Sequence, residues 1–141
     1  MKNIIAFLAL VFTFAQLQAA PTQEVMEAIK HASPLPSLMM VIKKHGDHLN
    51  LSEEQKAGMT AWSEKHFPML AELSMAVKAG EQAVHDAVVD GVTEEDVMIQ
   101  VNELSKKRQT IASMKIDCRD NMRTILNDEQ WKQLVELYKK I

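Results

Sequence analysis

The sequence predicts an all-α protein built on a long antiparallel helical hairpin with two shorter helices, that is, a four-helix hairpin. Three observations predict this class. The composition is rich in methionine, with ten, and poor in glycine and proline, with four of each. The same short helix-start pattern occurs at residues 51–55 and again at residues 126–130. Between these copies lie two long amphipathic segments joined at residues 90–92, which is the pattern expected of two helices that pack together.

Each copy of the short pattern has the chemistry of a helix start. The first reads Leu51-Ser52-Glu53-Glu54-Gln55 and the second reads Leu126-Asn127-Asp128-Glu129-Gln130. The Ser or Asn side chain can accept a hydrogen bond from a free backbone N–H. The Gln three residues later can reach back and complete a capping box. The acidic residues between them stand where the helix dipole favours negative charge.

The segment before the first copy predicts two short helices. Residues 22–31 can form a helix with Val25, Met26 and Ile29 on one face, and Pro34 and Pro36 then interrupt it. A second helix is expected from about residue 36 to 49. Asn50 can adopt the left-handed conformation that ends it.

The two long helices each show an apolar seam at spacings of three and four residues. Pro68 lies inside the first, so we expect a kink or a local opening near residues 64–67. The first seam ends in small residues and comprises Met59, Trp62, His66, Met69, Leu73, Ala76, Gly80, Ala83 and Ala87. The second comprises Val97, Val101, Leu104, Ile111, Met114, Cys118, Met122 and Ile125.

The start of the chain is typical of a secretory signal. Lys2 precedes an apolar run at residues 4–15, and small residues suitable for cleavage follow. We therefore expect a signal peptide at residues 1–19, a short helix and proline-rich break at 20–35, and one helical domain at 36–141. The predicted location is the periplasm. The formal charge of −3 becomes −4 when Lys2 is removed, which argues against nucleic acid as a partner.

An exported, all-helical chain with two such boxes framing a long hairpin resembles the CpxP/Spy group of periplasmic stress proteins. Metal-responsive proteins of the ZraP and CnrX kind share that architecture. The resemblance covers roughly residues 36–141, with Ser52 and Asn127 at positions where the family usually has threonine. It implies a curved, often dimeric helical hairpin. Two activities go with it: holding unfolded envelope proteins or a membrane sensor partner, and binding metal ions.

Basic residues on the second long helix are candidates for client binding. Lys115, Arg119 and Arg123 recur at intervals of four, with Arg108 further along. Such a stripe could attract acidic, partly unfolded proteins by charge. The alternative interpretation is a solvated helix face whose cations lie near a helix C-terminus.

Sulfur and imidazole groups are candidates for a metal site. Met114, Cys118 and Met122 share one helix face, and soft thiolate and thioether ligands favour Cu(I), with Zn(II) possible if imidazoles dominate. Folding the hairpin about Gly91 would bring His66 near the level of Cys118, and folding the chain about Asn50 would bring Met40 to within about a turn of the same level. A second possibility is that His45 and His48 chelate together or face Met122. The alternative interpretation is that methionine at this spacing and a lone cysteine are core residues.

Catalysis is not expected, because the chain shows no P-loop, HExxH or paired CxxC pattern. His31 and His85 show no partner and are interpreted as surface residues. Three hypotheses remain: a stress protein that binds unfolded clients or a sensor, a heavy-metal sensor or resistance protein, and a structural helical module. In the last, Cys118 would cross-link a homodimer.

Overall fold

The computed structural model describes residues 21–140, and the predicted signal peptide lies outside this range. The described chain is all-helical and contains no strand. Five α-helices and one 3₁₀ helix follow in the order α1 Gln23–His31, α2 Leu38–His45, η1 Gly46–Leu49, α3 Glu53–Val89, α4 Glu94–Ile125 and α5 Asp128–Lys139. The predicted all-α class is confirmed.

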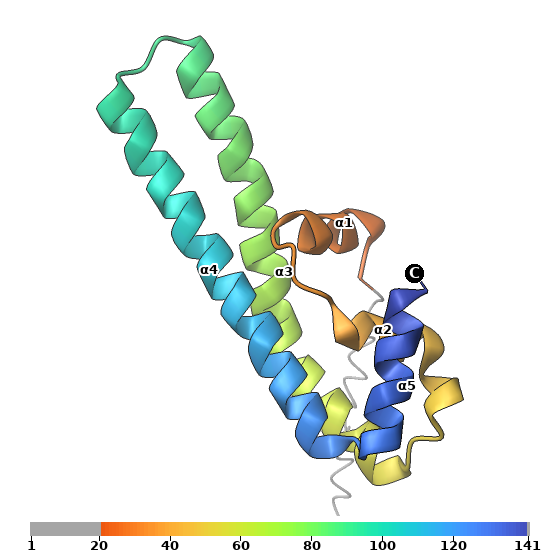
Figure 1. The fold of residues 1–141 in the computed structure, drawn as a ribbon. Helices are drawn as coiled ribbons and strands as arrows, with labels where there is room; N and C mark the ends of the chain where they lie inside the picture. The colour runs from red at the N-terminus through yellow and green to blue at the C-terminus, as the bar shows by residue number, and fades with distance from the viewer. Residues whose placement is uncertain (1–20, 141) are drawn as a thin grey trace, which may run out of the picture.

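The two longest helices, α3 and α4, lie side by side along the length of the molecule (Figure 1). The chain reverses between them at Gly91, which has a φ of +77°. Glycine suits this position because it adopts positive φ without a steric penalty. Thr93 then caps α4 by accepting a hydrogen bond from the backbone N–H of Asp96 at 3.3 Å.

The shorter helices cover only one half of the α3–α4 pair. Helix α1 packs across α3, while α2, η1 and α5 gather near the end where α3 begins and α4 finishes (Figure 1). The other half, residues 79–105, extends away from them as a two-helix projection that we call the arm. Because two helices alone can bury little surface, the arm is the least covered part of the described chain.

Two apolar clusters hold the covered half together. The larger lies between α2, η1, α5 and the adjoining ends of α3 and α4, and its most deeply buried members are Leu49, Met122 and Leu134. The smaller lies under α1, where Ala32 packs with Val77 and Ile111. These clusters fix α1 and α5 on the α3–α4 pair.

The buried line on α3 differs from the predicted seam. Met59 is buried as expected, but the other buried residues are Ser63, Ser74 and Val77, one position on from the predicted Trp62, Leu73 and Ala76. Met69, another predicted seam residue, is exposed. The cause is that α1 also packs on α3, so the most buried side of α3 lies between α1 and α4. The seam of α4 is confirmed at Leu104, Ile111, Met114, Cys118 and Met122.

Two local expectations also changed, one on α2 and one at Pro68 of α3. The helix expected at residues 36–49 begins at Leu38 and continues as a 3₁₀ turn over Gly46–Leu49, so it is shorter than predicted. Asn50 ends it in the left-handed conformation, with a φ of 47°, as expected. Helix α3 runs through Pro68 without interruption.

Candidate functional site

The two predicted capping boxes are both formed, and they meet in space. Ser52 accepts from the backbone N–H of Gln55 at 3.2 Å, and Asn127 accepts from that of Gln130 at 2.8 Å. The two glutamine side chains then bond to each other, with Gln55 Nε2 2.8 Å from Gln130 Oε1 and Gln130 Nε2 3.1 Å from Gln55 Oε1. We call this contact the glutamine clamp.

The glutamine clamp also binds the backbone around it. Gln55 Nε2 donates to the carbonyl of Ile125 at 2.8 Å, and Gln130 Nε2 donates to that of Leu49 at 3.2 Å. The clamp therefore joins the start of α3, the end of α4 and the end of η1. The sequence indicates this contact, because a chain that reverses midway between two copies of a pattern brings those copies together. The Leu residues that open the boxes lie nearby: Leu126 is buried and Leu51 packs against the same core.

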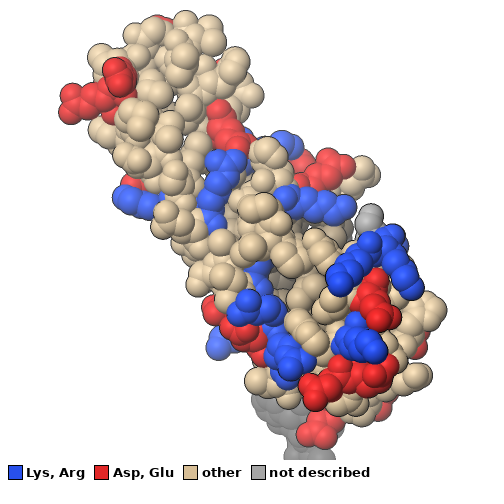
Figure 2. Space-filling view, viewed as in Figure 1, with Lys and Arg blue, Asp and Glu red and all other residues tan. Residues whose placement is uncertain are grey.

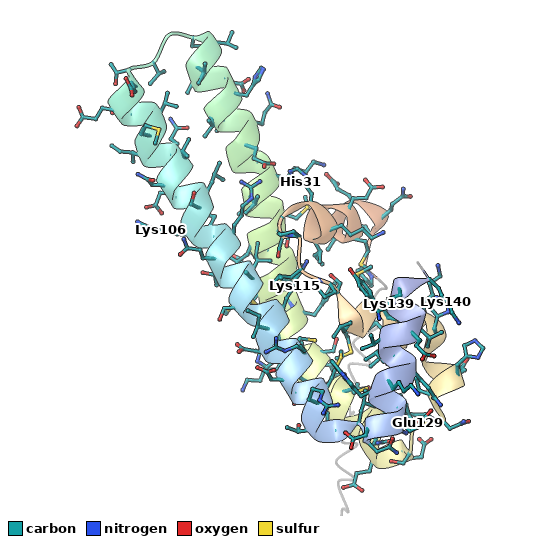
Figure 3. The ribbon with its side chains drawn as sticks, viewed as in Figure 1. His31, Lys106, Lys115, Glu129, Lys139 and Lys140 are labelled. Atoms are coloured by element: carbon teal, nitrogen blue, oxygen red, sulfur yellow. The ribbon has the colours of Figure 1, made fainter. Side chains whose placement is uncertain are left out.

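Lys115 does not lie on an exposed basic stripe. Its side chain is 7% exposed, and its Nζ donates to the backbone carbonyls of Ile29 at 3.1 Å, Ser33 at 3.3 Å and Leu35 at 3.0 Å. Figure 3 shows it between α4 and the segment that joins α1 to α2. Burial lowers the pKa of this ammonium group. Its role in this geometry is to tie the end of α1 to α4.

The three arginines of the predicted stripe are partly exposed and paired with neighbours. Arg119 contacts Asp120 at 2.7 Å, and Arg108 pairs with Glu81 of α3. Arg123 lies 3.5 Å from Asp128, and its guanidinium is 4.9 Å from the centroid of the Trp131 ring. Their charges are thus partly compensated within the chain, which weakens the case for a basic client surface.

Glu81 links three helices. It accepts a hydrogen bond from Arg108 of α4 and lies 2.7 Å from Nε2 of His31 at the end of α1. Burial raises the pKa of Glu81, but the hydrogen bonds and charges of His31 and Arg108 outweigh it and lower the pKa below 4.5. His31 was expected to lack a partner, and this expectation was wrong. His85 also has a neighbour, Asp86, at 3.2 Å.

The structure brings together some of the predicted sulfur ligands. Met40, Met114 and Cys118 line one internal cavity. Cys118 is buried, and burial raises the pKa of its thiol to about 11, an effect that a backbone hydrogen bond from Met39 opposes only in part. Burial therefore disfavours the thiolate form of Cys118, and a metal binding to this sulfur would have to displace the proton.

The histidines predicted as ligands lie elsewhere. His66 bonds through Nδ1 to the carbonyl of Trp62 at 2.8 Å and stacks on its ring at 4.2 Å, so it does not line the cavity that holds Cys118. His45 and His48 have ring centroids 6.4 Å apart. Met122 is fully buried in the larger core. Within residues 21–140, no group of three His, Cys, Asp or Glu side chains could hold a metal ion.

The far end of the arm carries five exposed large apolar side chains, which we call the arm tip. Val88 and Val89 are 59% and 71% exposed, Val92 is 41%, and Met98 and Ile99 are 46% and 56%. Figure 2 shows this end of the molecule as mostly uncharged, with acidic groups at its edge. Exposed large apolar residues gathered in this way mark interaction surfaces more often than isolated ones do. The sequence predicts only helix packing for residues 79–105, so this exposed surface was not expected.

The charge of the arm has one sign. Residues 79–105 contain no lysine or arginine, whereas their acidic residues are Glu81, Asp86, Asp90, Glu94, Glu95, Asp96 and Glu103. Of these, Glu81 and Glu103 are paired with cations outside the arm. The remaining five surround the turn at Gly91. The arm tip is therefore an apolar surface with an acidic rim.

Comparisons with protein-family models, with curated proteins and with solved structures found no match to this chain. Among the helices of residues 21–140, none has the length and apolar character needed to cross a membrane.

Proposed function

We propose that this protein is an exported, non-catalytic stress protein that binds exposed segments of unfolded proteins on its arm tip. The observation that carries the proposal is the arm tip itself. Five large apolar side chains are left between 41% and 71% exposed near the free end of a two-helix projection, away from the shorter helices. An unfolded chain exposes the apolar side chains that would cover such a surface.

The charge around the arm tip indicates which unfolded segments would bind there. Asp86, Asp90 and the acidic residues at the start of α4 surround the apolar side chains, and the arm has no lysine or arginine. Opposite charges at the rim of an interface speed association and select the partner. The proposed clients are therefore apolar segments flanked by basic residues, which reverses the acidic clients expected from the predicted basic stripe.

Other parts of the proposal rest on the sequence and on the resemblance. The signal-like pattern at residues 1–19 supports export to the periplasm. The two boxes, which meet in the glutamine clamp, support the resemblance to the CpxP/Spy group and its four-helix hairpin. From that resemblance we carry over a homodimer and a membrane sensor protein as further proposed partners.

Suppression of aggregation tests the proposed function. The purified protein is mixed with a reduced, aggregating exported protein, and light scattering is followed with wild type and with the double variant Val89→Ser, Ile99→Ser. Both residues are more than half exposed, so the change should alter the stability of the fold little. The matched control is Ile116→Ser, an exposed apolar residue of α4 outside the arm.

We expect wild type and the Ile116→Ser control to suppress scattering and the arm variant to require roughly ten- to a hundredfold more protein. This estimate assumes that each substituted side chain loses about half of the ~1.5–3 kcal/mol available from full burial. No suppression by wild type at several-fold excess, or equal suppression by all three proteins, would contradict the proposal.

A further inference from the structure

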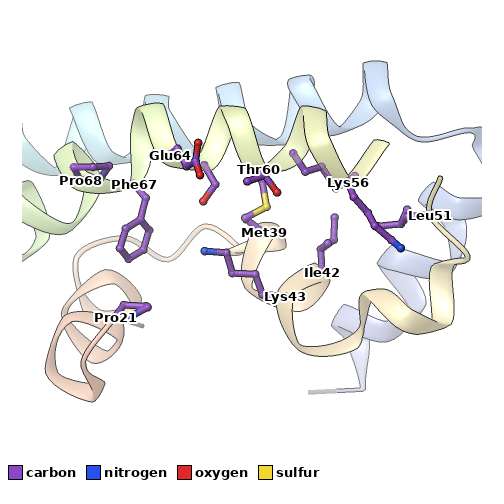
Figure 4. A pocket seen from close by; sticks show the side chains of 12 residues that line it. Pro21, Met39, Ile42, Lys43, Leu51, Lys56, Thr60, Glu64, Phe67 and Pro68 are labelled. Atoms are coloured by element: carbon purple, nitrogen blue, oxygen red, sulfur yellow. The ribbon is translucent and has the colours of Figure 1, made fainter. Parts of the chain in front are cut away.

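A surface groove between α2 and α3 leads into an internal cavity. The groove has a volume of about 640 Å³, and Figure 4 shows side chains of α2 and α3 that line it. The cavity behind it is about 60 Å³. Groove and cavity share several lining residues, Pro21, Met39, Lys43, Ser63 and Phe67, so the two spaces adjoin. Neither lies on the arm.

The internal cavity is lined almost entirely by apolar side chains. Four methionines contribute to its wall together with Trp62, Leu70 and Cys118, the methionines being Met26, Met39, Met40 and Met114. Methionine side chains adapt to the shape of an occupant. The Lys115 ammonium, which also borders the cavity, is already bonded to three carbonyls. A buried water molecule needs two to four polar partners, so this cavity favours an apolar occupant.

A lysine side chain lies where the groove meets the cavity. Lys43 lines both spaces, and its Nζ lies 5.2 Å from the centroid of the Phe67 ring. Within residues 21–140 it forms no ion pair, whereas Lys56 on the groove is paired with Glu53. The carboxylate of the groove is Glu64, which forms no ion pair with Lys43 in the described chain. Lys43 therefore lies at the mouth of an apolar cavity without an ion-pair partner among residues 21–140.

We propose that this site binds a medium-chain fatty acid. The carboxylate pairs with Lys43 at the mouth, and the chain passes between Met39 and Phe67 into the cavity. One water-sized group needs roughly 10–15 Å³ of such space, so the cavity accepts about four to six methylene groups. The remainder of a chain of about ten carbons lies in the groove. This site is separate from the arm tip and does not depend on the proposed function.

Methyl NMR on the purified protein with decanoate tests the proposal. The methionine methyl groups are labelled with ¹³C. Titration should shift those that line the cavity, Met26, Met39, Met40 and Met114, and leave Met98 on the arm tip unchanged. Calorimetry on the same samples gives the dissociation constant. Decanol, which has the same chain without the charge, is the ligand control, and Lys43→Gln and the neighbouring exposed Lys44→Gln are matched variants.

We expect saturable decanoate binding that weakens roughly tenfold in Lys43→Gln and is unchanged in Lys44→Gln, as for loss of one charge-assisted contact. Decanol should bind wild type and Lys43→Gln equally. Absence of saturable binding, equal binding of decanoate to both lysine variants, or shifts of Met98 alone would overturn the proposal. Shifts of the cavity methionines with Cu(I) but not with decanoate would also overturn it, in favour of a metal. The arm variant Val89→Ser, Ile99→Ser should bind decanoate normally, so the two proposals fail separately.

Discussion

Replacing Gln130 tests the glutamine clamp, which we expect to be the strongest polar contact between the ends of the long helices. The side chain is 8% exposed. It accepts from the backbone N–H of Asn127 at 3.1 Å and from Gln55 Nε2 at 2.8 Å, and it donates to Leu49 at 3.2 Å and to Gln55 Oε1 at 3.1 Å. Each such bond contributes roughly 0.5–1.5 kcal/mol net, and a buried partner left unpaired costs more.

Gln130→Ala should therefore lower the free energy of unfolding by about 2–4 kcal/mol, a large part of the ~5–15 kcal/mol of a typical domain. Urea unfolding followed by circular dichroism measures it, and the midpoint should fall by about 1–2 M at unchanged slope. The control is Gln133→Ala on the same helix, whose side chain makes one exposed hydrogen bond to Glu129 at 3.2 Å and should cost less than ~0.5 kcal/mol.

A double-mutant cycle separates the clamp from the two local caps. Gln55→Ala and Gln130→Ala should be coupled by about 0.5–2 kcal/mol, because each removes the other's partner. Two results would refute this interpretation: a loss of unfolding free energy in Gln130→Ala no larger than in Gln133→Ala, or additive losses in the two clamp variants. Either would mean that the clamp contributes nothing beyond ordinary helix capping.

Three further predictions follow from single contacts. Gly80→Val should destabilise the protein by about 1–3 kcal/mol in urea unfolding, because even a Cβ at Gly80 would lie 2.5 Å from Leu104 Cδ2, whereas Gly58→Ala, with its nearest neighbour at 3.4 Å, should be tolerated. Equal tolerance at both positions would show that α3 and α4 are not in close contact at Gly80. The lowered pKa of Glu81 contributes stability above its unfolded value of 4.5 that is lost as the pH falls through the folded pKa, so Glu81→Gln should flatten the fall in unfolding free energy below about pH 5. An unchanged pH profile would mean that His31 and Arg108 do not lower the pKa of Glu81 in the folded protein. With its thiol pKa raised to about 11, Cys118 should react with thiol reagents at neutral pH far more slowly than in urea and should give a monomer on non-reducing electrophoresis. A disulfide-linked dimer would place Cys118 at the surface.

Local signals in the sequence predicted the helix boundaries well because their causes are local. Ser52, Thr93 and Asn127 each cap a helix with groups no more than three residues away, and Asn50 ends η1 through its own backbone conformation. The seam of α4 was confirmed from Leu104 to Met122, since one neighbour, α3, dominates the packing of α4, whereas Val97, Val101 and Ile125 are only partly buried. The seam of α3 was displaced because α1 packs on it as well, and no periodicity within α3 reveals that contact.

The site residues depended on contacts that sequence spacing cannot supply. Lys115 follows the period of Arg119 and Arg123, yet it is buried because three carbonyls around the α1–α2 connection converge on its Nζ. His66 was expected beside Cys118, but its Nδ1 forms a hydrogen bond with the backbone carbonyl of Trp62, one turn earlier. The grouping of Met40, Met114 and Cys118 around one cavity was predicted from the level of each residue along the paired helices. Level along a helix can be counted from the sequence, whereas the direction of a side chain depends on what packs beside it.

Photo-crosslinking tests most directly whether the arm tip binds unfolded clients. A photoreactive amino acid is placed at Val89, at Ile99 or, as the control, at Ile116, all of them exposed. Each protein is irradiated with an unfolded exported protein and separately with its folded form. We predict crosslinks to the unfolded protein from positions 89 and 99, fewer at high salt, and none from position 116. Equal crosslinking from all three positions, or crosslinks from position 116 alone, would contradict the account.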